Sequence, residues 1–197
     1  MDWGRQRFVL GGIMSRVCEV QLKRSTGRKM KRHPALVPLS REHHTGLVMA
    51  QRLILGRSTN PRSPWPSEVH GQADRLLRFF QEELQPHFDF EETELFARLL
   101  EWPTEASVPW QPLLQDLVRD HTVMRAMINE LSIGREAGLP ERLRAFGERL
   151  RAHIHSEERE LFQRIQTECS NDQLTELTQI VAAYAETPGS SCKLESG

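Results

Sequence analysis

The sequence of 197 residues is poor in cysteine, in long apolar segments and in net charge. Its three cysteines have neither disulfide-type nor metal-type spacing, which suits the reducing cytoplasm: Cys18, Cys169 and Cys192. No apolar run approaches the roughly 18 residues that cross a bilayer, so we expect no membrane contact. A net charge of −1 offers no broad basic surface for nucleic acid. We therefore expect a cytoplasmic protein with a single hydrophobic core.

The two ends of the chain differ from its middle. Residues 1–33 are basic and show no sustained periodicity, so we expect an N-terminal arm that is disordered. Residues 187–197 have the composition of a C-terminal tail. The predicted domain therefore covers residues 34–186.

Within this domain, apolar residues recur at steps of three and four, which is the spacing of amphipathic helices. We expect Ser40 to cap the first helix, Asn171 or Asp172 to cap the last, and Pro86 to distort the second. No segment has the alternation of a strand. The predicted helices cover about residues 39–55, 67–102, 109–137, 140–169 and 172–186.

One segment of 22 residues occurs twice in the chain. Residues 77–98 align without a gap on residues 143–164, and 12 of the 22 positions are identical. The core of the match is H-x-x-x-E-E-x-E-L-F. A repeat of this kind indicates duplicated architecture.

The repeat also carries a histidine and a glutamate four residues apart, His87 with Glu91 and His153 with Glu157. Residues i and i+4 share one face of a helix, so both side chains can reach one metal ion. Both pairs lie in the middle of an apolar stripe, where an unpaired carboxylate would be costly. Metal binding would explain both pairs.

The other two long helices repeat as well. Leu39-x-Arg41-Glu42-His43 matches Leu117-x-Arg119-Asp120-His121 at an offset of 78 residues. The chain thus reads as two like helical hairpins, and it predicts an all-α, up-down four-helix bundle with a short C-terminal fifth helix.

One ligand set from each helix gives four imidazoles and two carboxylates: His43, His87, Glu91, His121, His153 and Glu157. Six such groups are too many for one tetrahedral zinc, and calcium or magnesium would not select histidine. Imidazole with carboxylate suits iron or manganese, with two metals sharing both carboxylates. His44 remains an alternative to His43, although the repeat favours His43.

The pattern H…HxxxE…H…HxxxE resembles the hemerythrin-like (HHE cation-binding) domain, over about residues 34–186. The resemblance implies a non-haem di-iron centre with an oxo or hydroxo bridge. It makes the four histidines terminal iron ligands and the two glutamates bridges. It also implies a small ligand, which would be a diatomic gas or a peroxide.

One position departs from the oxygen-carrying hemerythrins, which have a further histidine one turn after the third-helix ligand. Here that position is Arg125. The chain is therefore similar to the four-histidine branch, which includes di-iron proteins of iron–sulfur repair and nitric-oxide stress. Open positions on both metals favour reaction with oxygen, nitric oxide or peroxide over simple oxygen carriage.

Three functions follow from this pattern. The first is a di-iron protein that binds or reacts with such ligands; metal binding is its firmer part, and enzymatic turnover is left open. The second is an iron- or oxygen-responsive sensor or interaction module, whose protein partner the sequence does not name. The third is a purely structural bundle.

The sequence also predicts the surroundings of several residues near the ligands. We expect Glu92 and Glu158 to be surface charges, and Glu94 and Glu160 to orient an imidazole or to form rim salt bridges. Arg125 should face the site. His33, His70 and His155 should be solvated.

Overall fold

The computed structural model describes residues 31–102, 109–134 and 138–186, and everything below concerns these residues. The described residues from Arg32 onward belong to one compact unit, which is the helical bundle. The predicted N-terminal arm and C-terminal tail lie almost entirely outside the described residues. Arg32 and His33, at the end of the predicted arm, are described: Arg32 pairs with Glu158, and the N–H of His33 donates to Gln166 Oε1 over 2.6 Å.

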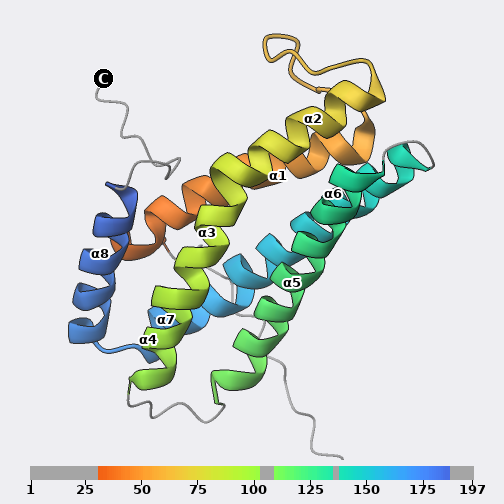
Figure 1. The fold of residues 1–197 in the computed structure, drawn as a ribbon. Helices are drawn as coiled ribbons and strands as arrows, with labels where there is room; N and C mark the ends of the chain where they lie inside the picture. Colours follow the sequence, from red (N-terminus) through yellow and green to blue (C-terminus); the bar gives the residue numbers. More distant parts are fainter. Residues whose placement is uncertain (1–30, 103–108, 135–137, 187–197) are drawn as a thin grey trace, which may run out of the picture. The chain divides into compact units, whose positions relative to one another are not determined.

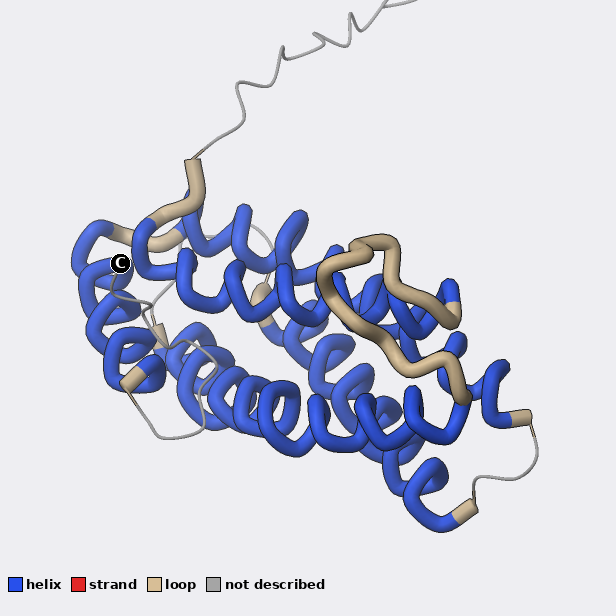
Figure 2. Tube along the Cα trace, turned by 90° about the horizontal axis from the view of Figure 1, so that it is seen from above, coloured by secondary structure: helices blue, strands red, loops and turns tan. Residues whose placement is uncertain are grey.

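All regular structure in the described ranges is helical, which confirms the predicted all-α class (Figures 1 and 2). The first long helix is α1 (Val37–Leu55), preceded by a short 3₁₀ turn η1 (Pro34–Leu36). The third and fourth long helices are α5 (Gln111–Ile133) and a run that begins with α6 (Leu139–Ser156). The fifth helix is α8 (Asn171–Ala185), which packs on η1 and on α1.

The second and fourth long helices are each interrupted by π-helical turns. The second consists of α2 (Val69–Phe79), η2 (Phe80–Leu84), α3 (Gln85–Phe90), η3 (Glu91–Leu95) and α4 (Phe96–Glu101). The fourth continues from α6 through η4 (Glu157–Leu161) into α7 (Phe162–Glu168). The turns η3 and η4 occupy equivalent positions of the two repeats, and each begins at the glutamate of its repeat. Such turns are frequent at functional sites.

The predicted caps of the first and the fifth helix are wrong. The first helix begins earlier than expected, with Leu36 at the cap position and Ser40 inside α1. Ser170 caps α8 in place of Asn171 or Asp172, in a capping box with Gln173. The expected distortion at Pro86 is present as the π-helical turn η2, which directly precedes Gln85 and Pro86.

The hydrophobic core consists of two clusters, one toward each end of the bundle. One cluster includes Met49, Phe88, Met124 and Ile154, and the other includes Leu39, Phe90, Leu117 and Leu161. On every long helix the predicted ligand histidine lies between a residue of the first cluster and a residue of the second. The fold therefore places the polar groups at mid-bundle, enclosed by apolar layers.

Candidate metal centre

Each of the four long helices contributes one buried imidazole to the middle of the bundle. His43 comes from α1, His87 from α3, His121 from α5 and His153 from α6, and none is more than 4% exposed. Glu91 and Glu157, at the first positions of η3 and η4, have no exposed surface. The structure thus brings together all six residues that the sequence pointed to.

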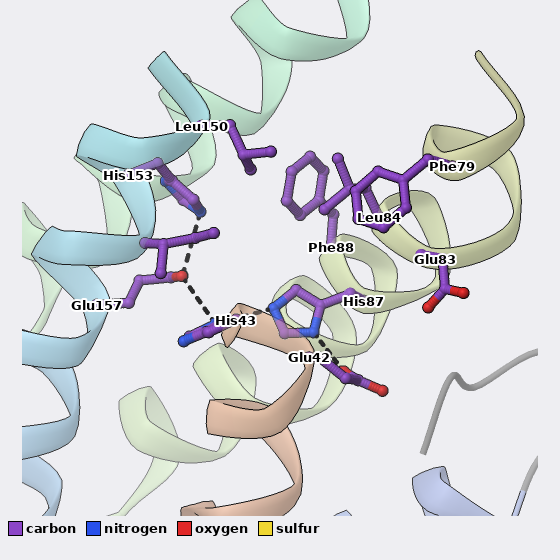
Figure 3. Close-up of a pocket in the computed structure, with 11 residues that line it drawn as sticks. Glu42, His43, Phe79, Glu83, Leu84, His87, Phe88, Leu150, His153 and Glu157 are labelled. Carbon is purple, nitrogen blue, oxygen red and sulfur yellow. Dashed lines mark hydrogen bonds and ion pairs between the residues drawn. The ribbon is translucent and has the colours of Figure 1, made fainter. Parts of the chain in front are cut away.

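Each glutamate divides its two carboxylate oxygens between two groups of histidines. Glu91 places Oε1 3.2 Å from His87 Nε2 and Oε2 3.4 Å from His121 Nε2. Glu157 places Oε2 3.2 Å from His43 Nε2 and Oε1 3.3 Å from His153 Nε2 (Figure 3 shows His43, His87, His153 and Glu157). The result is two adjacent four-residue clusters that share both carboxylates: His43, His87, Glu91, Glu157 and Glu91, His121, His153, Glu157.

The inner nitrogens of the histidines face one another in pairs. The Nε2 atoms of His43 and His87 are 3.1 Å apart, and those of His121 and His153 are 2.9 Å apart. The outer Nδ1 atoms of His43, His87 and His121 lie next to carboxylates, so each must donate its N–H there. In the neutral tautomer the paired Nε2 atoms then present lone pairs to each other, and a cation between them relieves that repulsion.

The four oxygens of Glu91 and Glu157 are also buried, and none accepts a hydrogen bond within the described part of the chain. A buried carboxylate without hydrogen bonds is costly unless it is paired with a cation. Four imidazole nitrogens and four carboxylate oxygens converge without thiolates, and this donor set fits iron or manganese. The residues present therefore fit a metal centre.

Every ligand histidine has an acidic partner on its outer side. Glu158 Oε1 is 2.8 Å from His43 Nδ1, and Glu92 Oε1 is 2.8 Å from His121 Nδ1. Glu42 Oε2 is 2.7 Å from His87 Nδ1. Such partners fix the orientation of a metal-binding imidazole and raise its basicity.

The fourth partner is looser. Asp120 Oδ2 lies 3.6 Å from His153 Nδ1, which is an ion-pair distance longer than a hydrogen bond. The other oxygen of Asp120 accepts from Arg149, whose Nη1 is 2.5 Å away.

These outer partners correct the expectation for the repeated acidic residues. Glu92 and Glu158 are half-buried and hydrogen-bonded to histidines of the other hairpin, and they are not surface charges. Glu94 and Glu160, for which the sequence left that role and rim salt bridges equally open, are exposed. The doublets Glu42-His43 and Asp120-His121 were visible in the sequence, yet each acid supports a histidine of another helix.

The outer acids are held in turn by arginine and serine. Glu158 binds Arg32 and accepts a hydrogen bond of 2.7 Å from Ser40 Oγ. Arg125 donates to Glu92 over 2.7 Å and to Asp89 over 3.0 Å. Arg125 therefore supports Glu92, the acid that binds the outer nitrogen of His121.

The fifth helix reaches the same layer. Tyr184, the single tyrosine of the chain, donates from its hydroxyl to Glu42 Oε2 over 3.2 Å. Its ring stacks on Phe90 with 4.2 Å between centroids. Through Glu42, α8 thus supports His87, a connection that no spacing in the sequence indicated.

Without a metal, the charges of the centre shift the pKa values of His87 and Glu157 in opposite directions. Burial lowers the pKa of His87, but the charge of the neighbouring Glu91 and the hydrogen bond to Glu42 outweigh it and raise that pKa to about 10. Burial and the charge of Glu91 raise the pKa of Glu157, but the nearby His153 and His43 outweigh them and bring it down to about 2. The metal-free centre is therefore a network of imidazolium and carboxylate groups.

The remaining histidines lie outside the centre. His44 and His70 are exposed, so the structure places His43, and not His44, among the converging groups. His33 is half-buried, and its Nδ1 accepts the N–H of Ala35 at the start of η1, so it is not simply solvated. His155 is also half-buried.

A helical bundle in which four imidazoles converge on two shared carboxylates defines a class of cation-binding proteins. A comparison with models of protein families matches the hemerythrin HHE cation-binding domain over residues 35–165. The chain therefore belongs to this family and is a metal-binding protein. Comparisons with curated proteins and with solved structures found no match. Among the described residues, no helix has the length and apolar character needed to cross a membrane.

Proposed function

We propose that the chain holds two iron ions in one centre and exposes them to a small ligand, which is dioxygen, nitric oxide or a peroxide. His43 and His87 would hold one ion, His121 and His153 would hold the other, and Glu91 and Glu157 would be shared by both. The observation that carries this proposal is the division of each carboxylate between two pairs of histidines. When bound, the two ions would supply redox chemistry and open ligand positions.

The residues of this chain define how such a centre is maintained. The outer acids keep the Nε2 atoms directed inward, and the apolar clusters on both sides exclude water. Arg125 is committed to Glu92 and Asp89, which supports a four-histidine centre. We further propose a cytoplasmic protein of oxidative or nitrosative stress, or of iron–sulfur repair.

The metal content of purified protein tests the centre. We expect about two irons per chain and charge-transfer bands of a bridged di-iron unit. Both should be lost in the Glu91→Ala/Glu157→Ala variant. The matched control is Glu94→Ala/Glu160→Ala, which removes the same charges from exposed positions of the same repeats. Metal that persists in the first variant, or manganese alone in the wild type, would refute the assignment.

The reactivity is tested separately. Reduced, iron-loaded protein is mixed with dioxygen, nitric oxide or hydrogen peroxide, and the optical spectrum is followed in time. A change with at least one of them is expected, whereas inertness toward all three would limit the protein to metal binding.

A further inference from the structure

A small cavity adjoins the centre on one side. Its volume is about 10 Å³, which is room for about one water-sized molecule. His43, His87, His153 and Glu157 form its polar wall, and Figure 3 shows them facing the apolar side chains. The apolar wall consists of Phe79, Leu84, Phe88, Leu150 and Ile154.

Glu83 also lines the cavity, and its carboxylate takes part in none of the interactions described above. It lies four residues before His87, outside the six predicted ligands, and it is half-buried. Its Oε2 atom is fully buried and receives no hydrogen bond from any described group of the protein. This oxygen is therefore available to accept a hydrogen bond from a water or another small molecule in the cavity.

A second, larger pocket lies outside the first. It has a volume of about 280 Å³, and its lining includes Arg52, Arg75 and Arg78. The two pockets share two residues, Phe79 and Glu83. Glu83 therefore stands where a molecule would pass from the outer pocket to the cavity at the histidines.

The position of Glu83 depends on a difference between the two repeats. Pro86 has no N–H, and its ring collides with the carbonyl four residues earlier in a regular helix. The turn η2 absorbs this conflict, because the N–H of Gln85 bonds to Phe80 O, five residues back. The turn is wider by one residue, which changes the direction of Glu83 relative to a regular helix.

The second repeat has no π-helical turn at the equivalent position. The residue equivalent to Pro86 is Ala152, and α6 runs through this region as a regular helix. The residue equivalent to Glu83 is Arg149, which is exposed and pairs with Asp120. The two halves of the bundle therefore differ at this position, and only the Glu83 side combines a carboxylate with the cavity.

We propose that Glu83 selects the ligand of the metal centre, and that the ligand it favours is hydrogen peroxide. This inference rests on the proposed di-iron function and narrows its ligand. Glu83 lines both the outer pocket, which has room for such a molecule, and the cavity at the histidines, so its Oε2 atom can accept a hydrogen bond from the O–H of hydrogen peroxide. Dioxygen and nitric oxide have no hydrogen to donate.

The negative charge of Glu83 should also hinder small anions that approach the cavity. The arginines attract anions into the outer pocket, but the carboxylate at the narrow point repels them electrostatically. Azide is a suitable probe, since it is a small anion that binds metal centres without being consumed.

Stopped-flow mixing of the iron-loaded full chain with azide or hydrogen peroxide tests the selection. Glu83→Gln keeps the size and removes the charge, so azide association should accelerate about tenfold. Glu83→Leu removes the acceptor, so the peroxide rate should fall about tenfold relative to the azide rate. Glu82→Gln is the control, because Glu82 is exposed and lines only the outer pocket.

The outcomes distinguish failure of this inference from failure of the proposed di-iron function. Wild-type protein that loads no iron refutes the proposed function. Iron-loaded variants in which the azide and peroxide rates are unchanged, or change by the same factor, refute the role of Glu83. Crystals of metal-free protein soaked in hydrogen peroxide give a second readout. We expect a hydrogen peroxide molecule within hydrogen-bond distance of Glu83 Oε2 in the wild type, and its absence there, with or without a water in its place, would also overturn the inference.

Discussion

The ligand histidines are oriented by acids that come from neighbouring helices. Glu158 follows the bridging Glu157 in sequence, yet its carboxylate binds His43 of α1, and Glu92 binds His121 of α5 in the same way. Partial burial raises the pKa of Glu158, but hydrogen bonds from His43 and Ser40 and the charge of Arg32 outweigh it, so its pKa lies below its ordinary value. Glu158 is therefore charged when it accepts the N–H of His43.

Glu158→Gln tests this role at the scale of one residue. The amide keeps the shape but loses the charge that stabilises His43 Nδ1–H, so metal affinity should fall about 10- to 100-fold. Competition with a chelator of known affinity measures this loss. Glu160→Gln is the matched control, because Glu160 is exposed two residues later. An equal loss in both variants would show that only net charge matters.

The ligands could be predicted from the sequence, whereas their supports could not. His87 with Glu91 and His153 with Glu157 follow from helix geometry alone, because residues i and i+4 share a face. The partner of Glu92 depends on how α5 packs against η3, which is tertiary information. Ser40 shows the same limit: it has the character of a cap, but it lies inside α1 and donates to Glu158.

At the scale of elements, the close approach of α1 to α6 fixes the distance across the centre. Gly147 of α6 lies against α1, and a Cβ atom there would be 2.8 Å from the carbonyl oxygen of Ala50. Gly46 of α1 lies against α6, and its Cβ would be 2.7 Å from Ile154 Cδ1. The first neighbour is backbone and the second is the end of a flexible side chain.

The two glycines should therefore respond differently to alanine. Gly147→Ala should lower the free energy of unfolding by about 1–2 kcal/mol, because the backbone must move apart and the gain in helix propensity offsets only part of the strain. Gly46→Ala should change it by less than about 0.5 kcal/mol, since Ile154 can rotate. Thermal unfolding followed by circular dichroism measures both. An effect of Gly147→Ala as small as that of Gly46→Ala would mean that α1 and α6 can move apart at little cost.

At the scale of the whole molecule, one centre connects all four long helices. The helices contribute opposite charges to a buried layer between two apolar clusters. In the absence of metal, imidazolium groups balance the two glutamates, and metal ligation requires these histidines to lose protons. Stability of the bundle and metal binding are thus linked through pH.

The direction of this linkage follows from the pKa values of the metal-free protein. Burial lowers the pKa of His153, but Glu157 and Asp120 outweigh it and raise it to about 9, and the pKa of His87 is about 10, both from an ordinary value of 6.5. Groups with a raised pKa stabilise the fold fully below pH 6.5, and this contribution is lost as pH rises through 9 and 10. The pKa of Glu157, lowered from 4.5 to about 2, gives a contribution that is lost as pH falls through that range.

We therefore expect the metal-free protein to lose stability as pH rises above 6.5, while bound metal needs the same histidines to be neutral. The difference in melting temperature between loaded and metal-free protein should grow from pH 6.5 to pH 9, because fewer protons must be displaced. Differential scanning calorimetry of both forms measures this difference. Metal loading should also release protons, and the heat of loading should therefore depend on the ionisation enthalpy of the buffer. The Glu91→Ala/Glu157→Ala variant should show neither effect. A difference that is constant or shrinks with pH would mean that the metal does not replace protons at His87 and His153.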